Sequence, residues 1–109
     1  MPRLTAKFWV DAYLRRLDRA LIPAFVVAKG DETAGAILVK SNTLNGLSIL
    51  YNRIYDGEGK RIWAELASGT ESDLDEIIAK QRKYDPDLWV IEVEDRGGRT
   101  LLDEDGLLG

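Results

Sequence analysis

One segment, residues 85–96, constrains the fold of this 109-residue chain more than any other. Its central residues are apolar at consecutive positions, so both faces of a strand formed by them would need to be covered. Alternate residues from Trp89 to Val93 would point to one face, and Leu88 and Val90 to the other, before acidic residues follow. This pattern is typical of a strand inside a sheet that is packed on both sides and that ends at a solvated edge.

Two helices are predicted, one before and one after a group of strands. The first spans residues 6–21, where apolar residues recur at helical spacing after Thr5, a favourable N-cap residue. The second begins after Thr70 or Ser72 and ends before Pro86. Its first turns are acidic and its last turn is basic, an arrangement that stabilises a helix through its dipole.

Further strands are predicted at residues 24–29, 36–40, 47–55, 61–67 and 99–102. Asn45-Gly46 is a strong hairpin signal, because both residue types tolerate positive φ. In the strand at 61–67, alternation predicts that one set faces the core and the other faces away. The core-facing set is Ile62, Ala64 and Leu66, and the other set is Arg61, Trp63 and Glu65. Four strands in succession, joined by short loops, indicate an antiparallel meander.

The element order α-β-β-β-β-α-β-β predicts one α+β domain that spans residues 1–109. We expect an antiparallel sheet of five to six strands with two helices. The strand formed by residues 85–96 would follow the second helix across one face and lie beside the first strand, which gives the strand order 5-1-2-3-4. Residues 103–109 are expected to form a mobile tail.

The composition excludes several classes of function. The chain has no cysteine and no histidine, which removes disulfides, thiolate and imidazole catalysis, and most zinc, copper and haem sites. The net charge of −4 is unfavourable for general nucleic-acid binding, which depends on neutralising phosphates. No apolar run is long enough to span a membrane, and the first residues lack the apolar core of a signal peptide. We therefore expect a cytoplasmic protein with no cofactor, no metal, and no nucleic-acid or membrane partner.

The segment from Gly30 to Gly35 has the glycine spacing of a phosphate-binding loop, but its context does not fit. Ala36 and Ile37 follow where a P-loop requires a lysine and a hydroxyl residue. A strand also follows where a dinucleotide-binding fingerprint requires a helix. We interpret the segment as a hairpin loop whose glycines allow positive φ.

Four carboxylates close together in the sequence could form an oxygen-only site for Mg²⁺ or Ca²⁺: Asp85, Asp87, Glu92 and Glu94. The alternative is a helix-to-strand turn followed by a solvated strand end. Because clustered surface carboxylates are common, we expect no metal site. Alternation places Trp63 away from the apolar side of its strand. Either the first helix covers that second face, or Trp63 lines a ligand groove with Asp85, Asp87 and Glu92.

The outer face of the first helix is the candidate surface for partner binding. Its residues are Phe8, Trp9, Ala12, Arg15, Arg16 and Arg19. An aromatic side chain flanked by arginines is typical of interface centres. We therefore predict that this face binds a second copy of the chain, forming a homodimer, or an acidic protein partner. The alternative is that Phe8 lies under the end of its own chain, where Leu107 and Leu108 could cover it.

Three ordered blocks of the sequence resemble a known family. They contain Phe8-Trp9-Val10, Thr33-Ala34-Gly35-Ala36 and Asp85-Pro86-Asp87-Leu88-Trp89-Val90. Together they resemble a small, single-domain family of proteobacterial proteins that is classed only as a domain of unknown function, DUF1491, over nearly the whole chain. The resemblance implies a stand-alone cytoplasmic protein. It implies no catalytic residue, because the family has no assigned activity.

The missing catalytic side chains favour a non-catalytic binding or assembly module. The alternative is a small enzyme or metabolite-binding protein that uses arginine, tyrosine and carboxylate side chains around a cleft. A deep pocket that holds charged groups with perturbed pKa values would favour the alternative. A large, flat apolar patch would favour the module.

Overall fold

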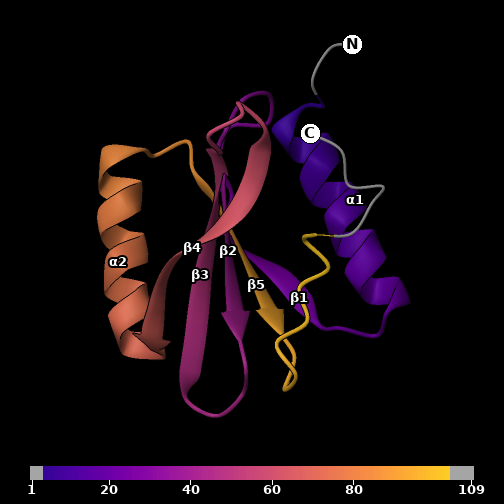
Figure 1. The fold of residues 1–109 in the computed structure, drawn as a ribbon, viewed down its shortest axis with the longest axis vertical. Helices are drawn as coiled ribbons and strands as arrows, with labels where there is room; N and C mark the ends of the chain where they lie inside the picture. The colour runs from indigo at the N-terminus through magenta and orange to yellow at the C-terminus, as the bar shows by residue number, and fades with distance from the viewer. Residues whose placement is uncertain (1–3, 104–109) are drawn as a thin grey trace.

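A five-stranded sheet separates two helices, one on each of its faces, in the computed structural model, which describes residues 4–103 (Figure 1). The chain runs through α1 (Ala6–Arg19), β1 (Ala24–Ala28), β2 (Ile37–Asn42), β3 (Leu47–Tyr55), β4 (Arg61–Thr70), α2 (Glu71–Tyr84) and β5 (Trp89–Glu94). The α+β class and the two helices are therefore confirmed.

Both helices begin where their capping residues predict. The Thr5 hydroxyl accepts a hydrogen bond from the Phe8 N–H at 3.2 Å, and the Thr70 hydroxyl accepts one from the Asp73 N–H at 3.2 Å. Helix α1 ends two residues before the predicted boundary, because Leu21 takes a left-handed conformation with a φ of 61°. Within residues 4–103, neither helix has the length and apolar character needed to cross a membrane.

The strand order is β1-β5-β2-β3-β4, and the prediction of an antiparallel sheet in the order 5-1-2-3-4 is wrong. Strand β5 lies between β1 and β2, antiparallel to the first and parallel to the second, so the sheet is mixed. The cause is the helical crossover: α2 returns the chain to the end of the sheet where β4 began, which makes β5 parallel to β4 and to β2. The central position suits β5 because both of its faces are apolar.

The predicted strand at residues 99–102 is absent from the described chain. A hairpin strand after β5 would need a free edge of β5, but β1 and β2 occupy both edges. The segment packs instead against α1: the Tyr13 hydroxyl donates to the Thr100 carbonyl at 2.8 Å, and Leu102 is buried. Apart from Asp103, the tail predicted for residues 103–109 lies outside the described residues.

Each helix covers its own hydrophobic core. On the α1 face, the buried cluster includes Trp9, Tyr13, Leu17 and Ile91. On the α2 face, the buried cluster consists of Leu38, Leu50, Leu74, Ile78, Leu88 and Val90. Strand β5 contributes to both clusters, as the alternation of residues 88–93 predicts.

A β-bulge interrupts the regular alternation of β4. Leu50 pairs with Ala67 but Tyr51 pairs with Glu65, so Leu66 is an extra residue in the ladder. Trp63 consequently lies on the α1 face, where its ring packs 5.4 Å from that of Trp9. Leu66, like Ile62, is exposed rather than in the core. The prediction that Ile62 and Leu66 face the core is therefore wrong. Helix α1 covers the face that carries Trp63, which is one of the two alternatives that the sequence left open.

The glycines at positions 30 and 35 serve close packing rather than a special backbone conformation. Neither adopts positive φ, so the predicted reason for them is wrong. A Cβ atom on either glycine would overlap the carbonyl oxygen of Asp87, which accepts a hydrogen bond from the Asp31 N–H at 2.9 Å. Because β1 and β2 are not paired, the segment joins two separated strands and is not a hairpin loop.

Candidate functional site

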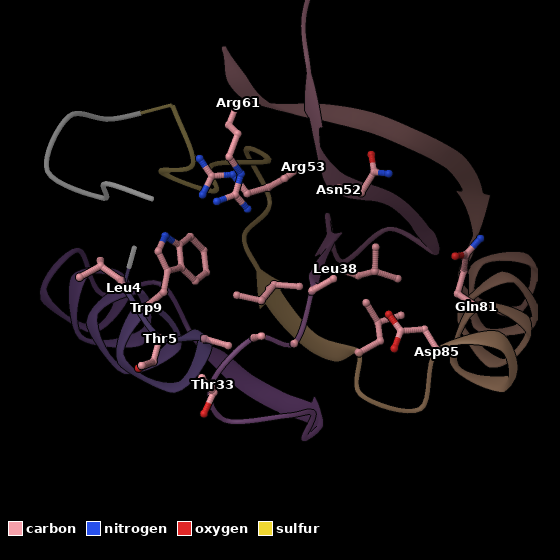
Figure 2. A pocket seen from close by; sticks show the side chains of 16 residues that line it. Leu4, Thr5, Trp9, Thr33, Leu38, Asn52, Arg53, Arg61, Gln81 and Asp85 are labelled. Carbon is pink, nitrogen blue, oxygen red and sulfur yellow. The ribbon is translucent and has the colours of Figure 1, made fainter. Parts of the chain in front are cut away.

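A cleft opens where β3 and β4 leave the rest of the sheet. Strand β3 pairs with β2 only from Ser48 to Tyr51, and beyond that point it continues with β4 alone as a projecting hairpin. The hairpin separates from the first residues of β2, Ile37 and Leu38. Between them lies a cleft of about 510 Å³, which Figure 2 shows between the hairpin and the ends of the two helices.

One end of the cleft is cationic. Arg53 and Arg61 share the α1 face of the hairpin, because Arg53 pairs with Trp63 and Arg61 pairs with Tyr55, two positions further along each strand. The Arg53 guanidinium lies 5.2 Å from the centre of the Trp63 ring, a cation–π contact that orients it. Figure 2 shows the two guanidinium groups at the same end of the cleft.

The indole of Trp9 forms the wall next to the arginines. The residue is only 3% exposed, and its Nε1–H has no hydrogen-bond acceptor. Trp89 provides the contrast, because its Nε1–H donates to the Asp31 carbonyl at 2.7 Å. A buried N–H group without an acceptor costs free energy in the folded state. In Figure 2 the indole nitrogen of Trp9 lies on the edge of the ring that faces Arg53 and Arg61.

The other end of the cleft carries acceptors and amides. Asp85 and Gln81, from the C-terminal end of α2, lie on the opposite side of the cleft from the arginines, and Asn52 lies between (Figure 2). The floor between the two ends is apolar and includes Ile37 and Leu38. A molecule bound along the cleft would therefore meet donors at one end and a carboxylate at the other.

A second polar cluster lies on the α2 face, among residues that do not line the cleft. Lys40 is almost fully buried, and its Nζ lies 3.3 Å from Glu71 Oε1, 3.1 Å from Asp75 Oδ1 and 3.4 Å from Glu92 Oε1. The amide of Asn42 donates to Glu71 at 3.1 Å and to Glu92 at 3.3 Å. Burial lowers the pKa of Lys40, but the three carboxylates outweigh it and raise this pKa overall.

Two tyrosines on the α1 face are also kept in their neutral form. Burial raises the pKa of Tyr13 far above its ordinary value. Burial, and then the nearby carboxylates of Glu65 and Asp103, raise the pKa of Tyr51. Neither phenol is therefore poised to act as a base near neutral pH.

The predicted partner face on α1 is divided between the surface and the core. Phe8 is 60% exposed, and Arg15 and Arg19 are exposed beside it. Ala12 and Arg16 are half-buried. Trp9 is in the core and lines the cleft, so its side chain does not belong to the outer surface.

The residues predicted to line one groove lie in three different places. Trp63 is on the α1 face and Glu92 is on the α2 face, where it contacts Lys40. Asp85 lines the cleft, while the backbone of Asp87 packs against the segment that precedes β2. Within residues 4–103, no group of three acidic side chains is placed to hold a metal ion.

The sequence interpretation missed the residues that give the cleft its polarity. Arg53 and Arg61 lie in the two strands that the turn at residues 56–59 joins. Pairing those strands across the turn would have placed both arginines on the same face of the hairpin. No comparable signal in the sequence pointed to Lys40. It follows three apolar residues in β2, and its partners come from α2 and β5.

Comparison with known proteins identifies relatives of the same fold. The family model described as "Protein of unknown function (DUF1491)" matches residues 4–103. The chain is similar to the crystal structure of a DUF1491 family protein from Caulobacter crescentus CB15, with a TM-score of 0.85 and 39% identity, covering 94% of this chain and 97% of that one. It is also similar to the solution structure of protein Atu0922 from A. tumefaciens, with a TM-score of 0.73 and 30% identity, covering 98% of this chain and 93% of that one.

No curated protein matches the chain significantly. The family match and the solved relatives agree over nearly the full length, and they confirm the resemblance seen in the three sequence blocks. The chain belongs to the DUF1491 family of proteins of unknown function.

Proposed function

We propose that the protein is a non-catalytic binding module whose cleft holds a small organic molecule. The observation that carries the proposal is the cleft itself, with cationic groups at one end, a carboxylate at the other and an apolar floor between them. Its volume of about 510 Å³ lies within the range of small-molecule sites in proteins. The proposal combines the non-catalytic module and the metabolite-binding alternative that the sequence left open.

The walls of the cleft support binding by a preformed site. Arg53 and Arg61 project from a paired hairpin, Trp9 projects from α1, and Gln81 projects from α2. Side chains held by regular elements lose little freedom when a ligand arrives, which favours affinity.

Lys40, Tyr13 and Tyr51, whose pKa values are raised, are not the groups through which the cleft would act. A general base or an activated nucleophile works best with a pKa near the working pH. The pKa of Lys40 is raised, and those of Tyr13 and Tyr51 are raised as well, so these groups move away from neutrality. None of the three lines the cleft.

Self-association, or capture of an acidic protein, through the outer face of α1 remains a second part of the proposal. The exposed ring of Phe8 beside Arg15 and Arg19 supports it. This surface lies on the opposite side of α1 from the buried Trp9 and Tyr13, so the two parts can be tested separately.

A fragment screen monitored by NMR tests the ligand-binding part. Compounds that enter the cleft are expected to shift the side-chain amide resonances of Asn52 and Gln81. The exposed Ala36 lines the cleft, so Ala36→Trp should block it and abolish these shifts. Ala79 is exposed on α2 away from the cleft, and Ala79→Trp is the matched control that should bind as the wild type does. A diverse library that shifts no cleft resonance in the wild type would refute the proposal.

A further inference from the structure

We infer that the ligand of the cleft carries a carboxylate at one end, bound by Arg53, Arg61 and Trp9, and an N–H donor group at the other, bound by Asp85. This inference rests on the proposed function and specifies the class of molecule that the cleft would take. It follows from the hydrogen-bonding groups that line the two ends.

Three donor groups converge on the cationic end. Within the described chain, the Arg61 guanidinium makes no hydrogen bond or ion pair, although the group is partly buried. Trp9 Nε1–H is buried without an acceptor, and Arg53 is held beside both by its contact with Trp63. A bound anion would give both the Arg61 guanidinium and the indole N–H an acceptor.

A carboxylate fits this end better than a more highly charged group. Its two oxygens accept paired hydrogen bonds from a planar guanidinium and leave lone pairs for an indole N–H. A phosphate would bring more negative charge into a cleft that Asp85 lines and into a protein whose net charge is −4. A single carboxylate satisfies the donors at a smaller electrostatic cost.

The far end and the floor define the rest of the ligand. Asp85 is an acceptor, and the amides of Asn52 and Gln81 supply further acceptor oxygens, so this end complements an ammonium or amide N–H. Ile37 and Leu38 between the two ends match a chain of methylene groups. The molecule is therefore an amino acid-like compound in which an apolar spacer separates the acid from the donor.

The indole resonances of the full-length protein give a direct test. Two-dimensional proton–nitrogen spectra contain one Nε1–H signal from each of the three tryptophans. We expect ε-aminocaproate to shift the Trp9 signal strongly, caproate to shift it less, and n-hexylamine to leave it unchanged. Trp89, whose N–H already donates to Asp31, is the internal control and should not move.

Variants and competing probes separate the possible outcomes. Arg61→Gln should weaken ε-aminocaproate binding roughly tenfold or more, because a hydrogen bond to a charged group is lost. Arg96→Gln, an exposed position away from the cleft, should not change it. If the Asn52 and Gln81 amide signals shift on ligand addition while the Trp9 signal does not, the inference is wrong but the proposed function stands. Tighter binding of inorganic phosphate than of caproate would overturn the inference as well.

Discussion

Replacing Lys40 with methionine should clearly destabilise the α2 face. The Lys40 side chain is only 4% exposed and contacts three carboxylates. Methionine keeps most of the side-chain volume but removes the ammonium. The carboxylates then repel one another, and any of them that cannot reach water stays buried without its cation.

The magnitude depends on how far each carboxylate can relax into solvent. Glu71 and Asp75 have side chains that are 48% and 64% exposed, so water can replace Lys40 for both. Glu92 is 12% exposed and would keep only the Asn42 amide, 3.3 Å away. Breaking a buried pair costs about 3–5 kcal/mol, and with one of the three acids truly buried we expect about 3 kcal/mol for Lys40→Met.

Urea unfolding followed by tryptophan fluorescence measures this cost, with Asp75→Asn as the matched control. The control removes an exposed partner and should cost less than about 1 kcal/mol. Adding Glu92→Leu to Lys40→Met should recover much of the lost stability, because the buried charge is gone. A Lys40→Met midpoint that equals the wild-type midpoint, or a control that loses as much as Lys40→Met, would refute this reasoning.

The remaining predictions concern the packing of the chain, its alkaline stability, metals and the α1 face. Gly30→Ala should destabilise the fold by about 1–3 kcal/mol in urea, since its Cβ would overlap the Asp87 carbonyl, and an unchanged midpoint would contradict this. Burial raises the pKa of Tyr13, so the wild type should lose stability as the pH rises above the ordinary tyrosine value of 10.0, and Tyr13→Phe should lose less when melting is followed at neutral and alkaline pH. Millimolar Mg²⁺ or Ca²⁺ should leave the melting temperature unchanged, and a rise that chelator reverses would reveal a metal site. If the outer face of α1 joins two copies, Phe8→Ser with Arg15→Glu should convert a dimer into a folded monomer in light scattering, and the same mass for both proteins would remove that proposal.

Local signals predicted the secondary structure well because the groups that decide it are close in sequence. Thr5 and Thr70 cap the helices that they precede, and Gly46 adopts a φ of 89° in the hairpin that Asn45-Gly46 predicts. The consecutive apolar residues from Leu88 to Ile91 correctly indicated a strand covered on both faces.

Long-range pairing could not be predicted in the same way. The position of β5 depends on the α2 crossover, and nothing between residues 24 and 40 indicates that another strand separates β1 from β2. One extra residue, Leu66, interrupts the alternation of β4, so alternation alone could not decide whether Trp63 lies under helix α1 or lines a groove.

The candidate site was harder still to predict from the sequence, because its residues come from distant parts of the chain. Asp85 was the one predicted groove residue that lines the cleft, and it was chosen for its place in an acidic cluster. Arg53, Arg61 and Gln81 came together only through the register of the hairpin and the position of α2. The missing acceptor of Trp9 Nε1 is a property of packing that no sequence pattern reports.

Native mass spectrometry after incubation with a bacterial metabolite extract shows whether the cleft binds a small molecule, without any assumption about which one. We expect a small-molecule adduct on the wild type and on Ala79→Trp, its loss on Ala36→Trp, and its weakening on Arg61→Gln. An adduct of equal intensity on all four proteins, or no adduct on any of them at saturating extract, would contradict the proposed function.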